Sequence, residues 1–114
     1  MAFIVFTRRN IAAIKALMRT ALPDLGSAHA DEALAAGIGF RTHAAMLAAL
    51  KAQSGAKLTV LLNEQSLSER LMELTGTAPD RDTLFFRALG EADLPDPPEL
   101  LRLGQWWRQV ANEN

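Results

Sequence analysis

The sequence predicts a mainly helical α+β fold with five to six short helices and two short β-strands. Apolar residues recur at spacings of three and four over most of the chain, which is typical of amphipathic helices. Two runs, Phe3 to Phe6 and Leu58 to Leu62, are instead rich in β-branched or alternating apolar residues and predict strands. With 114 residues, 49% of them hydrophobic, we expect residues 1–114 to form one domain around one core.

The first strand has no polar alternation, so we expect it to be covered on both faces. Thr7 or Asn10 is expected to cap the helix that follows, because each is a good N-cap residue ahead of a periodic stretch. Pro23 and Gly26 predict its end. The apolar positions of this helix are Ile11, Ile14, Leu17, Met18 and Leu22.

Two further helices are predicted before the second strand. Ser27 is placed to cap the first of them, and Gly37 or Gly39 to end it in a left-handed conformation. Thr42 is placed to cap the next, which we expect to pack back through Leu47 and Leu50 and to end at Ser54 and Gly55.

The two predicted strands leave two arrangements open, because a lone pair of short strands is not stable in water. Either the two strands pair within the chain and form a ribbon that lies over helices, or they pair with the strands of a second, twofold-related copy in an obligate dimer.

The second half of the chain continues with helices. Ser66 and Glu69 have the spacing of a capping box for a helix that Gly76 ends. A loop over 77–83 leads to a short predicted helix over 84–89. Asp96 as cap and Pro97 at the first helical position predict a last amphipathic helix with the stripe Leu100, Leu103, Trp106, Trp107 and Val110.

The segment from Glu32 to Leu50 has the layout of a helix-turn-helix. Gly39 stands in the turn, Phe40 follows it, and Thr42 opens a second helix of the kind that enters a DNA major groove. That second helix is mostly alanine, however, and base contacts need long polar side chains. The candidate DNA-binding residues are Arg8, Arg9, Lys15, Arg19, Arg41, His43 and Lys51, with Met46 and Gln53 as further groups on the second helix.

Charge is divided between the two halves. Residues 1–57 hold seven basic and three acidic residues, whereas residues 58–114 hold five basic and ten acidic ones. The basic half is suited to a polyanion, but opposite charges also let the halves attract each other within one fold or across a dimer.

Residues 11–50 resemble a short helical module of small bacterial accessory and mobile-element proteins, which also occurs at the front of glyoxalase-related proteins. The matching residues are Ser27, His29, Ala33, Ala36, Gly39, Phe40, Thr42 and Leu47. Ala28 separates Ser27 from His29, where the module has the serine and histidine adjacent, and the glyoxalase metal ligands are absent. The resemblance therefore implies a small accessory protein of phage or mobile-element type, without an enzymatic activity.

No pattern in the sequence predicts a catalytic, metal or cofactor site. There is no cysteine, and the histidines, His29 and His43, lack a second histidine or a carboxylate at metal-ligand spacing. Serines lack a nucleophile-elbow context, and the Gly37–Gly39 pair lacks the lysine of a phosphate-binding loop. We expect a non-enzymatic protein without cofactors. The longest apolar stretch near the start, residues 2–6, is too short for a membrane span or signal core, so we expect a cytoplasmic location.

Two functions remain, both of them binding functions. The first is a protein-interaction module, such as an inhibitor or adaptor, whose acidic half and Trp106–Trp107 pair meet a protein partner. The alternative is a DNA-binding regulator, dimeric on twofold DNA, that uses the basic half. No membrane contact or small-molecule substrate is predicted.

Overall fold

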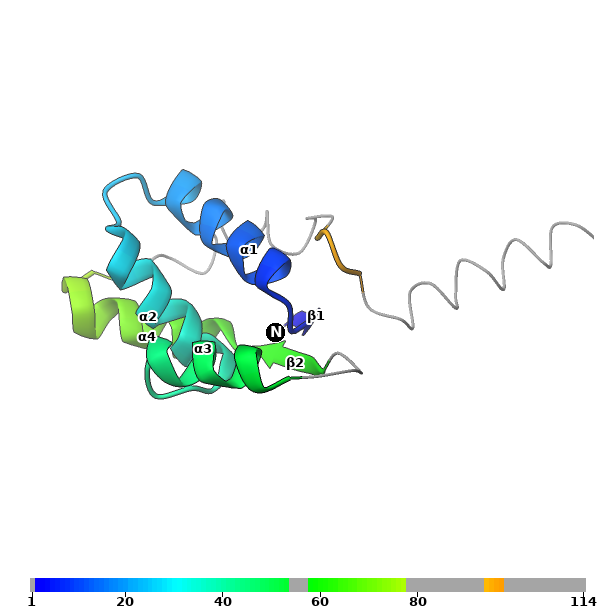
Figure 1. Ribbon diagram of the computed structural model, residues 1–114. Helices are drawn as coiled ribbons and strands as arrows, with labels where there is room; N and C mark the ends of the chain where they lie inside the picture. The colour runs from blue at the N-terminus through cyan, green and yellow to red at the C-terminus, as the bar shows by residue number, and fades with distance from the viewer. Residues whose placement is uncertain (1, 54–57, 78–93, 98–114) are drawn as a thin grey trace, which may run out of the picture.

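The computed structural model describes residues 2–53, 58–77 and 94–97. In chain order these residues form β1 (Ala2–Val5), α1 (Arg8–Ala21), α2 (Ser27–Ile38), α3 (His43–Ala52), β2 (Thr59–Leu62) and α4 (Glu64–Thr75) (Figure 1). The mainly helical composition with two antiparallel strands is as predicted, with four helices in the described ranges rather than five to six. The helices predicted over 84–89 and from Asp96 onward lie outside the described residues.

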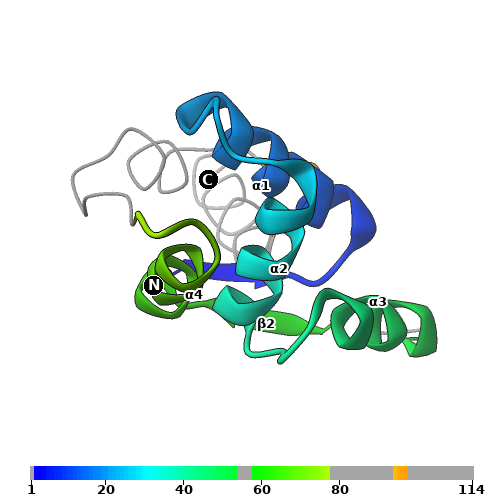
Figure 2. The ribbon, with the colours of Figure 1, turned by 90° about the vertical axis from the view of Figure 1, so that its left-hand side faces the viewer.

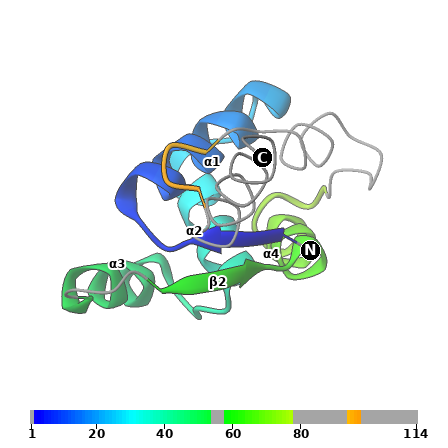
Figure 3. The same ribbon diagram turned by 90° about the vertical axis from the view of Figure 1, so that its right-hand side faces the viewer.

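The two strands pair with each other within the chain. They run antiparallel, with Phe3 opposite Leu61 and Ile4 opposite Val60. The ribbon lies over α2 and α4, which are behind it in Figure 3. Its inner face buries Ile4 and Leu62, but Phe3 on the outer face is 71% exposed. The expectation that β1 is covered on both faces holds at Val5, which shares the outer face and is buried, and it is wrong at Phe3.

Helix α1 begins where one of the two predicted caps stands. The side chain of Thr7 accepts a hydrogen bond from the backbone N of Asn10, 3.2 Å away. The helix then buries Ile11, Ile14 and Met18 and ends at Ala21.

Helix α2 lies at the centre of the core. It packs most extensively on α4 and also contacts α1, α3 and β2. Its small residues allow this close packing. A Cβ atom on Gly37 would lie 2.9 Å from Cδ1 of Leu62 and 3.1 Å from Cβ of Leu67. Gly39, not Gly37, ends the helix, with a φ of 102° that favours glycine.

Two predicted caps are wrong. The N-cap position of α2 is Gly26, and Ser27 is the first helical residue, whose hydroxyl accepts a hydrogen bond from Lys15 instead. Helix α4 begins at Glu64 rather than after Ser66, because the Asn63 side chain caps it by accepting from the backbone N of Ser66. The caps of α3 at Thr42 and the left-handed end of α4 at Gly76 are confirmed.

A buried polar clasp joins the start of α1 to the segment 94–97. The Asn10 side chain is fully buried and donates through Nδ2 to the carbonyl oxygens of Val5 and Asp96, each at 2.8 Å. Its Oδ1 accepts from the backbone N of Asp96 at 2.9 Å. Thr7 donates its hydroxyl to Oδ2 of Asp96 at 2.7 Å, and Arg9 lies 3.7 Å from Oδ1 of the same carboxylate. Both N–H donors of the Asn10 amide are thereby used, together with one of the two lone pairs of its oxygen.

Candidate functional site

The seven candidate DNA-binding residues lie on α1, on the α2–α3 turn and on α3. Along α1, Arg8, Lys15 and Arg19 are spaced by seven and four residues, which places them on one stripe of the helix. Arg41 stands in the turn and is exposed, and Lys51 is exposed near the end of α3. The structure therefore does not gather all seven residues into one cluster.

Two of the seven are held by carboxylates of α2. Nζ of Lys15 lies 2.8 Å from Oδ1 of Asp31 and donates to the hydroxyl of Ser27 at 2.7 Å. Nε2 of His43 lies 3.9 Å from the same Asp31 oxygen. The Asp31 carboxylate offsets the positive charge of Lys15 toward a polyanion. These contacts connect α1, α2 and α3, so we assign Lys15 and His43 to the internal framework.

The turn between α2 and α3 is fixed by several hydrogen bonds. The backbone N of Phe40 donates to Ala35 and that of Gly39 to Ala36. Oε2 of Glu32 accepts from the backbone N of His43 at 3.2 Å, so a side chain of α2 holds the first residue of α3. Phe40 stacks on Phe6 with ring centroids 5.6 Å apart. The helix axis turns by 64° between α2 and α3.

Helix α3 presents a broad face to solvent, and it stands apart from the other helices in Figure 2. Met46 and Leu50 are buried, whereas Leu47 is 44% exposed. The prediction that Leu47 packs back is therefore wrong, and so is the placement of Met46 on the surface. The exposed residues of this helix are Ala44, Ala45, Leu47, Ala48, Lys51 and Ala52. We call this set the α3 face.

The α3 face carries few polar groups. His43 is held by α2, and Gln53 donates to the carbonyl oxygen of Phe6 at 2.8 Å while accepting from the backbone N of Leu58. Within the described residues, Arg41 and Lys51 are thus the long polar side chains left exposed at the two ends of this face. The small alanine side chains between them allow close approach of another backbone.

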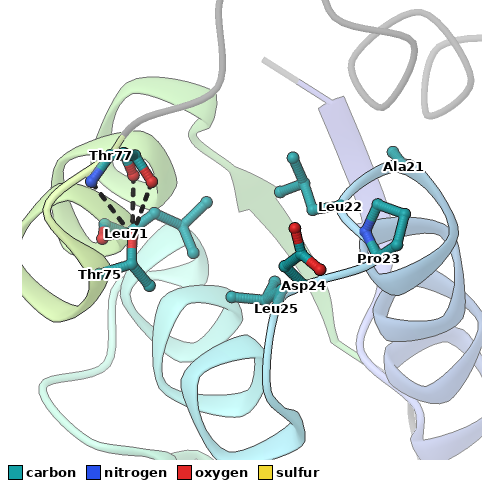
Figure 4. Close-up of a pocket in the computed structure, with 8 residues that line it drawn as sticks. All are labelled: Ala21, Leu22, Pro23, Asp24, Leu25, Leu71, Thr75 and Thr77. Atoms are coloured by element: carbon teal, nitrogen blue, oxygen red, sulfur yellow. Dashed lines mark hydrogen bonds between the residues drawn. The ribbon is translucent and has the colours of Figure 1, made fainter.

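A cavity of about 450 Å³ lies between the α1–α2 turn and the end of α4 (Figure 4). Its lining is partly apolar, with Asp24, Thr75 and Thr77 as the polar members. The Thr75 hydroxyl already lies within hydrogen-bond distance of the Leu71 and Thr77 carbonyl oxygens. The cavity therefore has room for a small ligand. These residues are Ala21, Leu22, Pro23, Asp24, Leu25, Leu71, Thr75 and Thr77.

In the ranges that the structure describes, no three histidine or acidic side chains are grouped so as to hold a metal ion. Within the same ranges no single helix is long and apolar enough to cross a bilayer, and α2 with α3 reach that length and composition only across their bend. The Trp106–Trp107 pair lies outside the described residues.

Comparison with known proteins identifies no relative: no family model, no curated protein and no solved structure matches the chain.

Sequence reasoning missed the surface role of Leu47. A leucine and a methionine at neighbouring positions of α3 point about 100° apart, so only one of them can face α2. Nothing in the local pattern chooses between Met46 and Leu47, because both are apolar. The choice depends on how α3 sits against α2, which Glu32 and the Gly39 turn determine.

Proposed function

We propose that this protein is a non-enzymatic protein-interaction module that binds a helical segment of a partner through the α3 face. The observation that carries the proposal is the make-up of that face, in which exposed alanines surround the 44%-exposed Leu47. Small residues let two helices pack closely, and Leu47 supplies a projecting apolar side chain for the partner's groove.

Charge at the ends of the face indicates the partner's chemistry. Arg41 and Lys51 are exposed there, one before α3 and one near its end. A partner helix with an apolar stripe and acidic residues at its borders complements this arrangement. Such charges mainly set association rate and specificity, while the apolar contact provides most of the affinity.

DNA binding remains the alternative, since the α2–α3 pair has a helix-turn-helix layout and Arg8, Arg19, Arg41 and Lys51 are exposed. The α3 face supports it less, because alanine and leucine side chains make no hydrogen bonds to base edges. DNA binding predicts affinity for duplex DNA that falls steeply with salt and weakens in the Arg41→Ala, Lys51→Ala double variant.

The test is a selection of displayed random peptides on the full-length protein. We expect enriched peptides with apolar residues at helical spacing and flanking Asp or Glu. Ala48→Arg should weaken their binding at least about tenfold, which corresponds to about 1.4 kcal/mol. Ala16→Arg is the matched control, since Ala16 is an exposed alanine of α1, and it should leave binding unchanged.

Both variants should unfold at the denaturant concentration of the parent protein, because both sites are exposed. Equal binding of the selected peptides to the parent and to Ala48→Arg would place the contact elsewhere and reject the proposal. Failure to enrich any peptide, together with salt-dependent DNA binding lost in the double variant, would replace it by the DNA alternative.

A further inference from the structure

The backbone N–H and C=O groups of β2 point toward β1 at alternate residues and away from β1 at the residues between them. The hydrogen bonds show which residues point which way. In an antiparallel pair, hydrogen-bonded and non-hydrogen-bonded residue pairs alternate. The backbone N of Phe6 donates to the carbonyl of Leu58 at 2.7 Å, one step beyond the pair Val5–Thr59. Ile4–Val60 is therefore a hydrogen-bonded pair. The N–H and C=O groups of Thr59 and Leu61 consequently point away from β1.

The outer edge of β1 obeys the same alternation, and it is occupied at the Val5 carbonyl. The outward carbonyl of Val5 accepts from Nδ2 of Asn10 and from the backbone N of Thr7. For Thr59 and Leu61, by contrast, no partner of the outward groups is found in the described ranges, and both residues are exposed. Within these ranges the outward groups of Thr59 and Leu61 are thus open, and this edge ends at Asn63, whose backbone N donates to the carbonyl of Gly37 at 2.7 Å.

The sequence of β2 does nothing to protect this edge. Natural proteins block open strands with proline, charged side chains or bulges. Thr59–Leu62 reads Thr-Val-Leu-Leu and contains none of these residues. On the outer face beside it, Leu61 is 37% exposed and its cross-strand neighbour Phe3 is 71% exposed.

We propose that β2 pairs antiparallel with β2 of a second copy of this chain, which joins the two ribbons into one four-stranded sheet. A twofold axis through Val60 places Thr59 of each copy opposite Leu61 of the other. Each of these two pairs then exchanges two hydrogen bonds, so all four outward groups of each strand are used.

This strand fits a second copy of itself for two reasons. The outward donors and acceptors of Thr59 and Leu61 are spaced symmetrically about Val60, so the edge is self-complementary under a twofold rotation. The side chains also match. Leu61 comes to lie beside Thr59 of the other copy on the outer face, and Val60 opposes Val60 on the inner face. The product has four strands, whereas two are marginal alone.

The proposal is independent of peptide binding by the α3 face, because it uses main-chain groups of a different element. The paired strands are short, so we expect a dimer that dissociates on dilution.

The test is sedimentation velocity of the full-length protein and its variants over a dilution series. Thr59→Pro removes an N–H that points to the open edge and none that bonds β1, so it should give a monomer at every concentration with the ribbon intact. Phe3→Lys is the matched control. It removes the largest exposed apolar side chain of the outer face but no edge group, and it should leave the dimer in place.

Amide hydrogen exchange gives a second readout that does not depend on a variant. Exchange of the Thr59 and Leu61 amides should slow as concentration rises, whereas the Val60 amide, bonded within the ribbon, should be protected at every concentration. A parent protein that stays monomeric with fast exchange at Thr59 and Leu61 would overturn the proposal. So would a monomer for Phe3→Lys beside a dimer for Thr59→Pro, because the contact would then be face to face.

Discussion

Thr7 has two roles at the start of α1, and their separation is the most direct test of the clasp. Its hydroxyl oxygen accepts from the backbone N of Asn10 as an N-cap, and its proton is donated to the Asp96 carboxylate at 2.7 Å. Among the described residues Thr42 has the first role alone, since its hydroxyl accepts from the backbone N of Ala45 at 3.0 Å. Valine has nearly the shape of threonine, so Thr7→Val and Thr42→Val remove these bonds with little change in packing.

The expected losses differ because the environments differ. Removal of an N-cap costs about 1 kcal/mol, which is the whole effect expected at the exposed Thr42. A hydrogen bond to a charged group adds about 1.5–3 kcal/mol, and Asp96 is only 9% exposed. We therefore expect Thr7→Val to lower the free energy of unfolding by about 3 kcal/mol in total.

The assay is urea unfolding followed by far-ultraviolet circular dichroism. A double-mutant cycle of Thr7→Val with Asp96→Ala should return a coupling of about 1.5–3 kcal/mol. Equal losses for Thr7→Val and Thr42→Val, with no coupling to Asp96, would refute the reasoning and show that the clasp adds nothing to stability.

Two further predictions concern packing and charge. Gly37→Ala should lower the free energy of unfolding by about 1–3 kcal/mol in the same urea assay, because the new Cβ would lie 2.9 Å from Leu62, although alanine is the better helix former. Gly26→Ala, where nothing lies within 4 Å, should change it by less than about 0.5 kcal/mol; similar losses at both sites would contradict close packing as the cause. Lys15→Met should cost about 1 kcal/mol at low salt and less at high salt, because the Lys15–Asp31 pair is partly exposed. A loss that does not change with salt would mean that Lys15 acts by packing rather than by charge.

Local signals in the sequence were enough to predict much of the described fold. Helices α1 and α3 begin at the predicted threonines, and α2 and α4 end at glycines with positive φ, because caps and left-handed ends depend on the residues nearest to them. The start of α4 was misplaced for a related reason. Asn63 and Ser66 are both good caps three residues apart, and only the end of β2 decides which one is used.

Long-range contacts could not be predicted in this way. Asn10 looks like a candidate cap in the sequence, yet its side chain is fully buried against Asp96, which is 86 residues away. The candidate site was affected likewise. Lys15 and His43 have the residue types of DNA contacts, but the packing of α1 and α3 on α2 brings both to Asp31. Neither the periodicity of apolar residues nor the spacing of charged ones predicts that α1, α2 and α3 place these three side chains together.

The clasp has a consequence for how the protein matures in the cell. Asn10 is synthesised before Asp96, which follows it by 86 residues. Until Asp96 is present, the Val5 carbonyl is the one clasp partner of the Asn10 amide. The amide groups that later bond the backbone of Asp96 are then unsatisfied at the start of α1. A chain that stops short of Asp96 lacks these partners, so it leaves one donor and the acceptor of the Asn10 amide without the bonds that they make in the folded protein.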